Sequence, residues 1–426
     1  MSVNDISLLD EEVGEKIKEL EEVDILVGIP SYNNSRTISH VVRAVNAGLA
    51  KYFPNAKSVL VSSDGGSIDG TPDLVNNTEV DNLDMILIEH PVYFVSKIVT
   101  PYHGIPGKGS AFRTIFKIAE ALNAKACCVV DSDVRSITPE WIELLLEPII
   151  YKGFDYVAPL YNRHKFDGTI TNSIVYPMTR ALYGKRIRQP IGGEFGFSGQ
   201  LASHYLTKNV WETDVARYGI DIWMTTTAIG DGFKVCQSYL GAKIHDAKDP
   251  GADLTNMFIQ VLGSLFSMME NYHDVWQKIS ISEQVPTFGF TFEVGLEPIA
   301  VNVERMIDNF KLGINALTPI LKQVISKESL KNLGNLAKKD TNKFHFPDEL
   351  WVETVYSYAL AFHHHILPNE QLMKSMIPFY MGRTASFVIE NKDSSSAEVE
   401  QKIESLCQQY EKLKPYLVNK WENHKI

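Results

Sequence analysis

The first half of the chain alternates short apolar runs with longer stretches in which apolar residues recur every three or four positions. Continuous apolar runs are typical of strands buried on both faces, and the three- and four-residue spacing is typical of amphipathic helices. Joining such strands through helices makes the sheet mostly parallel. The predicted strands are 24–29, 58–62, 85–88, 126–130 and 156–160, and the predicted helices are 38–52, 110–122 and 139–149. The sequence therefore predicts an α/β fold with a mostly parallel sheet.

The pattern changes to long amphipathic helices from about Asp253 onward. The clearest of these predicted helices are 254–272, 298–317 and 349–365. We expect three parts, namely an N-terminal helix over 1–22, an α/β domain over 23–250 and a helical C-terminal region over 251–426.

Charge and composition exclude several functional classes. The formal net charge of −11 argues against nucleic-acid binding, which requires a basic face. The four cysteines include no Cys-x-x-Cys pair, and the acidic N-terminus lacks the apolar core of a signal peptide. No apolar run reaches the roughly 18 residues of a membrane span. We therefore expect a soluble, cytoplasmic protein.

Polar turns follow the first two predicted strands. Residues 30–34 read Pro-Ser-Tyr-Asn-Asn, and residues 64–71 read Asp-Gly-Gly-Ser-Ile-Asp-Gly-Thr. Ligands of open parallel sheets bind beyond the carboxyl ends of the strands, and a carboxylate there could hold a ribose or a base. Taken alone, each segment is explained equally well as an ordinary turn, with a helix cap at Thr71. Neither G-x-G-x-x-G nor a P-loop occurs, which argues against hydride transfer and P-loop chemistry.

Lys108 stands between two glycines where a predicted helix begins, a position that favours an anion. A flexible loop with a solvated lysine is the equal alternative. Asp131-Ser132-Asp133 follows a predicted buried strand directly. Carboxylates suit Mg²⁺ or Mn²⁺, which neutralise diphosphate oxygens, so we interpret this motif as a metal site.

Two later motifs carry single carboxylates, and one carries a histidine. Glu194 follows a glycine pair, Asp221 follows Tyr-Gly-Ile, and His245 follows a strand-like stretch over 233–244. Each also has a purely structural explanation. Glu194 could belong to a turn, Asp221 could lie at the start of a helix, and His245 could be a histidine whose hydrogen bonds are made within the protein. Functionally, His245 could supply the nitrogen ligand that completes the metal shell.

With its motifs in this order, the chain resembles the GT-A nucleotide-diphospho-sugar transferases. Within them it is most similar to the retaining glucosyl-3-phosphoglycerate and glucosylglycerate synthases. The resemblance covers about residues 24–265. It follows Pro30-Ser31-Tyr32-Asn33, Asp64 to Thr71, Gly107-Lys108-Gly109, Asp131-Ser132-Asp133, Gly193-Glu194, Tyr218-Gly219-Ile220-Asp221 and His245.

The resemblance implies a hexosyltransferase that moves a hexose, in this family glucose, from a nucleotide sugar with retention of configuration and with Mg²⁺ or Mn²⁺. The metal-bound diphosphate leaves as the acceptor hydroxyl attacks the same face of the sugar, so positioning and charge stabilisation replace a protein nucleophile. The implied donor-binding residues are Pro30, Tyr32, Asn33, Asp64, Gly66, Lys108, Asp131 and Ser132. The implied acceptor-binding residues are Thr169, Thr171 and Gly193, the catalytic residues Glu194 and Asp221, and the metal ligands Asp133 and His245.

The sequence departs from this family at the acceptor. Relatives that use phosphoglycerate carry an arginine at the position of Thr169, and they continue His-Arg-Asn where this chain has His245-Asp246-Ala247. Losing a guanidinium and gaining a carboxylate disfavours a phosphorylated acceptor. We therefore expect glycerate or another small hydroxylated acceptor, with 3-phosphoglycerate as the alternative. The missing charge could come from Arg163, Arg180, Arg186 or Arg188.

Three other functions remain open. An inverting transferase on the same fold would use Glu194 or Asp221 as the base. A sugar-1-phosphate nucleotidyltransferase is disfavoured because its G-x-G-x-R loop is replaced by Pro30-Ser31-Tyr32-Asn33. A non-catalytic nucleotide-sugar-binding protein is the third. The base of a UDP-, GDP- or ADP-hexose donor is not fixed, and the helical region could form a homodimer.

Overall fold

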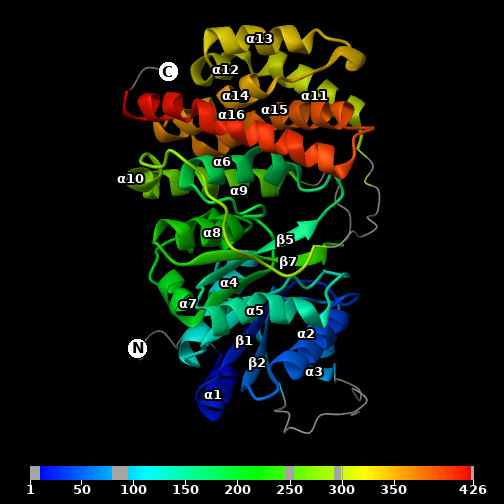
Figure 1. Ribbon diagram of the computed structural model, residues 1–426, viewed down its shortest axis with the longest axis vertical. Helices are drawn as coiled ribbons and strands as arrows, with labels where there is room; N and C mark the ends of the chain where they lie inside the picture. Colours follow the sequence, from blue (N-terminus) through cyan, green and yellow to red (C-terminus); the bar gives the residue numbers. More distant parts are fainter. Residues whose placement is uncertain (1–9, 79–94, 245–253, 292–298, 300, 424–426) are drawn as a thin grey trace. The chain divides into compact units, whose positions relative to one another are not determined.

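Residues 10–78, 95–244, 254–291, 299 and 301–423 are described by a computed structural model (Figure 1). The predicted strand 85–88 and His245 lie outside these residues. The chain divides into two compact units. The first unit comprises Met1–Asn162, Gln189–Asp246 and Val285–Val294, and the second comprises Arg163–Arg188, Ala247–Gln284 and Gly295–Ile426. The sequence analysis predicted three consecutive parts with boundaries after residues 22 and 250, whereas this division gives two units that alternate along the chain.

The first unit contains an eight-stranded sheet in the order β3-β2-β1-β4-β6-β5-β7-β8. The strands are β1 (Ile25–Ser31), β2 (Ser58–Asp64), β3 (Ser96–Pro101), β4 (Ala126–Val129), β5 (Tyr156–Asn162), β6 (Phe195–Ser198), β7 (Val235–Ala242) and β8 (Thr287–Phe288). Strand β6 runs antiparallel to both of its neighbours, and the other adjacent pairs are parallel. The predicted mostly parallel α/β sheet is confirmed.

Helices cover both faces of this sheet. Side chains alternate along a strand, so Val27 and Ile29 of β1 enter the core shared with α2 (Ile38–Tyr52) and α5 (Pro139–Lys152). The opposite face of β1 carries Gly28, where a Cβ atom would lie 2.6 Å from the Ile115 side chain of α4. The remaining helices of the first unit are α1 (Glu11–Leu20), α3 (Thr71–Asn77), α4 (Lys108–Ala121), α7 (Gly199–Leu206), η3 (Asp214–Ala216) and α8 (Ile220–Gly230).

The second unit is helical among the described residues, as the sequence predicts for the C-terminal region. Its first segments are η2 (Thr171–Val175), α6 (Tyr176–Tyr183), α9 (Thr255–Asn271), α10 (His273–Trp276), α11 (Val303–Ala316) and α12 (Thr318–Val324). Its remaining segments are α13 (Lys327–Ala337), η4 (Thr341–Lys343), α14 (Asp348–His363), α15 (Asn369–Glu390) and α16 (Ser396–Glu422). Within the described part of the chain, no helix is long and apolar enough to cross a membrane.

A buried ion-pair network ties α6 to α16 inside the second unit. The Arg180 side chain is only 1% exposed, and its Nε atom lies 2.8 Å from Glu411 Oε1. Its Nη2 atom donates to Glu404 Oε1 at 2.9 Å. Bidentate guanidinium–carboxylate pairs fix direction as well as distance, so this network sets the register of the two helices.

Candidate active site

The turns that follow β1, β2 and β4 are linked by side-chain hydrogen bonds, because these three strands are parallel neighbours. The Ser132 hydroxyl donates to Asn34 Oδ1 at 2.7 Å, and the Thr37 hydroxyl donates to the Ser132 carbonyl at 2.7 Å. The main-chain N–H of Asn33 donates to the Ser67 hydroxyl at 2.8 Å. Predicted donor-site residues from three strand ends therefore belong to one network.

Asp64 organises the turn over residues 64–71, here called the Asp64 turn. Its Oδ2 atom accepts from the main-chain N–H of Gly66 at 2.8 Å and of Ser67 at 2.7 Å. Its Oδ1 atom accepts from the hydroxyls of Ser67 at 2.7 Å and Ser31 at 3.0 Å. Gly66 has φ +83°, a conformation that favours glycine. The buried Asp64 carboxylate therefore organises this turn, and Gly70 rather than Thr71 is the N-cap of the following helix α3.

An exposed apolar surface borders the same turns. The side chains of Tyr32 and Ile68 are 62% and 93% exposed, and Asn33 Oδ1 accepts from the main-chain N–H of Ile68 at 3.0 Å. Pro30 is buried in β1. An exposed aromatic ring just beyond the carboxyl end of a strand is suited to stack against a planar ligand.

Five charged side chains form a continuous chain of ion pairs beyond the ends of β4 and β7. This charge cluster consists of Lys108, Asp131, Glu194, Asp221 and Lys243. The Asp131 carboxylate lies between two ammonium groups, with Oδ1 2.8 Å from Lys108 Nζ and Oδ2 3.0 Å from Lys243 Nζ. Lys108 begins α4 and also lies 3.2 Å from Asp221 Oδ1 at the start of α8. Lys108 is therefore not the solvated lysine of the alternative interpretation.

Lys243 connects the deepest part of the charge cluster. Its Nζ atom donates to both carboxylate oxygens of Glu194 at 2.8 Å and to the Gly192 carbonyl at 2.8 Å. The Tyr161 hydroxyl also donates to Glu194 Oε2. The Glu194 side chain is fully buried, so its charge depends on these partners.

The charge cluster shifts the pKa of its members in opposite directions. Burial raises the pKa of Glu194 to about 7, against the opposing effect of Lys243. Burial likewise raises the pKa of Asp221, which Lys108 partly offsets. Burial would also raise the pKa of Asp131, but Lys108 and Lys243 together outweigh it and lower that pKa. Asp131 is therefore held as a carboxylate, whereas Glu194 titrates near neutrality.

Gly193 is required by the geometry of the charge cluster. It has φ +94°, and a Cβ atom there would lie 2.2 Å from Asp131 Oδ2 and 2.7 Å from Lys243 Nζ. Any side chain would displace the Asp131–Lys243 pair. The structure thus brings this predicted acceptor residue together with both predicted catalytic residues, Glu194 and Asp221.

Asp133 differs from the charge cluster because its carboxylate has no partner among the described residues. It is half-buried in the turn after β4, two residues beyond Asp131. Magnesium is commonly held by one or two carboxylates together with substrate phosphates, so a single available carboxylate fits such an ion. His245 lies outside the described residues, and within them no group of three His, Cys, Asp or Glu side chains forms a metal cage.

The other two predicted acceptor residues belong to the second unit. Thr171 begins η2 and Thr169 lies two residues before it. Both are buried, and the Thr169 and Tyr380 hydroxyls share a hydrogen bond of 2.6 Å. The arginines considered as substitutes for the missing phosphate-binding charge all have partners. These partners are Asp167 for Arg163, Glu404 and Glu411 for Arg180, Ser282 for Arg186, and Glu400 for Arg188.

Sequence reasoning missed two members of this site, Lys243 and Tyr161. Lys243 directly follows β7 and Tyr161 is the second-last residue of β5, two strands with mostly apolar sequences. Their shared partner Glu194 is 49 residues from Lys243 and 33 residues from Tyr161 in sequence. The available signal for Lys243 was a lone charge directly after β7, a strand buried along its whole length. A charge in that position needs a buried partner.

Together these features gather polar and charged side chains at the carboxyl ends of the strands of a mostly parallel sheet, the place where α/β proteins bind nucleotides. Comparison with known proteins finds similarity to one group of enzymes, the glucosyl-3-phosphoglycerate synthases. The glucosyl-3-phosphoglycerate synthase of Petrotoga mobilis is 26% identical over 269 residues, which cover 60% of this chain and 77% of that protein. The predicted resemblance to this group is therefore confirmed in sequence.

Solved structures of the glucosyl-3-phosphoglycerate synthase from Mycobacterium tuberculosis are also similar. One, in complex with Mg²⁺ and uridine diphosphate, has a TM-score of 0.44 and 22% identity, covering 59% of this chain and 83% of that one. Another, with Mn²⁺, UDP-glucose and phosphoglyceric acid, has a TM-score of 0.43 and 21% identity, covering 60% and 84%. No model of a protein family matches the chain.

Proposed function

We propose that this protein is a metal-dependent, retaining glycosyltransferase that moves glucose from a nucleotide sugar to a small hydroxylated acceptor. The observation that carries the proposal is the end of β4, where Asp131 is held between Lys108 and Lys243 and Asp133 is left available. The sequence similarity to a glucosyl-3-phosphoglycerate synthase supports the same chemistry.

In this proposal the strand-end turns bind the donor. The exposed Tyr32 ring stacks on the base, and the Asp64 turn supplies a preformed wall whose carboxylate needs no ligand. Asp131 contacts the ribose, and Lys108 lies near the diphosphate. Asp133 and His245 hold Mg²⁺ or Mn²⁺, which when bound neutralises the charge of the leaving diphosphate.

Glu194 and Asp221 orient the sugar and acceptor hydroxyls in the proposed reaction. Lys108, which lies near the leaving diphosphate in this proposal, also forms an ion pair with Asp221. The same lysine therefore positions the Asp221 carboxylate beside the sugar. Positioning of this kind is the main contribution expected when no protein nucleophile takes part.

For the acceptor we propose glycerate rather than 3-phosphoglycerate. Thr169 replaces an arginine of phosphoglycerate-using relatives, and the guanidinium groups of Arg180 and Arg188 are already paired with glutamates. A phosphate is recognised best by a free bidentate guanidinium. The four cysteines are buried thiols, which is typical of a reducing compartment, so the proposal places the enzyme in the cytoplasm.

The inverting alternative requires a carboxylate that can accept the acceptor proton. Glu194 does not fit this role, because it is fully buried and both its oxygens accept from Lys243. Asp221 is the better candidate, since its pKa is raised by burial. The anomeric configuration of the product separates the two functions.

The test is a turnover assay with UDP-, GDP- and ADP-glucose against glycerate and 3-phosphoglycerate, each with and without Mn²⁺. We expect metal-dependent transfer from one donor to glycerate, with an α-glycoside as product by NMR. A β-glycoside would contradict retention, and equal turnover with 3-phosphoglycerate would contradict the acceptor assignment. No transfer from any of the three donors would contradict the function itself.

A further inference from the structure

Tyr102 follows β3 and connects two parts of the proposed donor site. Its main-chain N–H donates to the Asp64 carbonyl at 3.2 Å, which joins it to the first residue of the Asp64 turn. Its hydroxyl accepts from the main-chain N–H of Gly107 at 2.9 Å. Gly107 directly precedes Lys108, the residue that the proposed function places near the diphosphate. Tyr102 therefore contacts both the Asp64 turn and the loop that carries Lys108.

The loop that meets the Tyr102 hydroxyl is fixed from its other side. A Cβ atom at Gly107 would lie 2.6 Å from the main-chain oxygen of Ala216, so the loop backbone packs closely against η3. The main-chain N–H of Gly109 donates to the Arg217 carbonyl at 3.2 Å. Because the Gly107 amide is held in place in this way, the hydroxyl bonded to it is held at a defined position as well.

The surroundings of the Tyr102 hydroxyl belong to the same candidate site. Partial burial raises the pKa of Tyr102, the Gly107 amide opposes this effect, and the nearby Asp64 carboxylate and Tyr32 phenol raise the pKa further. The group is therefore a neutral, protonated phenol at neutral pH. Its neighbour Tyr32 carries the exposed ring that the proposed function stacks on the base.

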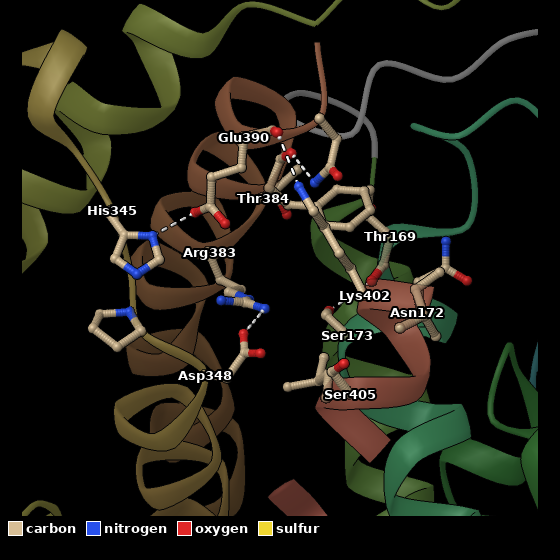
Figure 2. A pocket seen from close by; sticks show the side chains of 15 residues that line it. Thr169, Asn172, Ser173, His345, Asp348, Arg383, Thr384, Glu390, Lys402 and Ser405 are labelled. Atoms are coloured by element: carbon tan, nitrogen blue, oxygen red, sulfur yellow. Dashed lines mark hydrogen bonds and ion pairs between the residues drawn. The ribbon is translucent and has the colours of Figure 1, made fainter. Parts of the chain in front are cut away.

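The hydroxyl hydrogen of Tyr102 has no acceptor in the described part of the chain, because the one hydrogen bond of this hydroxyl is accepted from Gly107. By contrast, Arg383 on the wall of a second-unit cavity is paired with Asp348 inside the protein (Figure 2). A phenol can accept one hydrogen bond and donate another, and accepting the amide hydrogen polarises its O–H bond. Tyr102 thus offers a positioned hydrogen-bond donor beside the proposed nucleotide.

From these contacts we infer that Tyr102 is a further donor-binding residue, whose hydroxyl donates a hydrogen bond to an oxygen atom of the nucleotide. Tyr32 stacks on the base, Lys108 lies near the diphosphate, and Tyr102 contributes a neutral hydrogen bond beside them. The ligand class is a nucleoside diphosphate. The inference rests on the proposed function, because it requires a nucleotide at the carboxyl ends of β1, β2 and β4.

The experiment is calorimetric titration of the full chain with UDP, GDP and ADP in the presence of Mn²⁺, for the wild type and for Tyr102→Phe. Phenylalanine keeps the ring and removes only the hydroxyl. We expect at least one nucleotide to bind the wild type, and to bind Tyr102→Phe about five- to tenfold more weakly, the effect of one lost hydrogen bond. Binding within about twofold of the wild type overturns the inference alone. No binding of any nucleotide to the folded wild type overturns the proposed function, and the inference with it.

Tyr151→Phe is the matched control, because Tyr151 is an exposed tyrosine near the end of α5 in the same unit. It should bind the nucleotide within about twofold of the wild type, and equal weakening in the two variants would overturn the inference. Kinetics in the turnover assay separate direct contact from an effect through Lys108. Loss of a direct contact should raise the donor KM of Tyr102→Phe about five- to tenfold and leave kcat within about twofold. A lower kcat at unchanged KM would mean that Tyr102 only positions Lys108, which also overturns the inference.

Discussion

The Asp64 turn and the charge cluster both hold a buried carboxylate at the carboxyl end of a parallel strand, but they stabilise it differently. Asp64 accepts four hydrogen bonds from neutral donors, three of them within three residues of it in sequence. Asp131 is held by two full positive charges that come from α4 and from the end of β7. The hydrogen bonds of Asp64 come mostly from its own turn and satisfy both carboxylate oxygens. The ion pairs of Asp131 depend on tertiary structure and on the protonation state of the neighbouring charged groups.

This difference suggests that the two carboxylates respond differently to a ligand. Neutral dipoles fix the Asp64 turn in a single form that a ligand has no reason to change. The charge cluster contains three carboxyl groups and two ammonium groups, so an arriving ligand charge must alter its interactions. We expect the cluster to respond to ligand and to pH, and the Asp64 turn to respond to neither.

Removing the ammonium of Lys243 should have the largest effect on stability. Lys243→Met leaves Glu194 and Asp131 buried without their shared cation, which should cost about 3–5 kcal/mol in the free energy of unfolding. Urea unfolding followed by circular dichroism measures this loss. The double variant Lys243→Met/Glu194→Gln should recover part of it, because one of the orphaned charges is then gone.

The matched control is Lys234→Met, an exposed lysine just before β7. It should change the unfolding free energy by no more than about 0.5 kcal/mol. Equal losses in the two lysine variants would mean that the buried ion pairs contribute nothing specific.

Truncation of Asp64 should have a smaller and purely structural effect. Asp64→Ala removes the acceptor of two main-chain N–H groups and two hydroxyls, which should cost about 1–3 kcal/mol. Asp73→Ala, an exposed change in the first turn of α3, is the control and should cost less than about 1 kcal/mol. If added nucleotide sugar widened the difference between Asp64→Ala and wild type, the carboxylate would have a ligand role and the comparison above would fail.

The pH dependence of stability should report Glu194. Its pKa is about 7 in the folded protein and has an ordinary value of 4.5, so the folded state binds more protons between these values. Stability should therefore fall as pH rises through this window, by at most about 1.4 kcal/mol per pH unit. The lowered pKa of Asp131 acts below its ordinary value of 3.8 and does not contribute here. Unfolding titrations of wild type and Glu194→Gln should differ in slope, and parallel slopes would contradict the assignment.

Asp133→Ala should have the smallest effect on stability, within about 0.5 kcal/mol, because the Asp133 carboxylate has no partner in the described part of the chain. Thermal unfolding without metal measures this change. A loss as large as that in Asp64→Ala would show that Asp133 is structural.

Sequence reasoning was most successful where structure is encoded locally. The strand ends at Pro30, Asp64 and Asp131 follow from period and turn chemistry, and the helix over 38–52 was predicted with its observed bounds. Strands β3, β6 and β8 were missed. Their pairing depends on strands distant in sequence, which a local pattern does not contain.

The charge cluster could be predicted only in part for the same reason. Its carboxylates follow visible motifs, but the choice of Lys243 as their partner depends on β7 lying next to β5. The hydrogen bonds of Asp64 within its turn also required the structure, because a turn residue and a ligand residue look alike in sequence. Thr169 was assigned from resemblance alone, and no sequence pattern predicted the hydrogen bond between its hydroxyl and that of Tyr380, far along the chain.

The most direct test of the central claim is calorimetric binding of UDP-, GDP- and ADP-glucose with and without Mn²⁺, to wild type, Asp133→Ala and Asp73→Ala. The account predicts that one donor binds the wild type and Asp73→Ala in a metal-dependent way, and that Asp133→Ala, although folded, loses this dependence. Metal-dependent binding that is unchanged in Asp133→Ala, or no binding of any donor to the folded wild type, would contradict it.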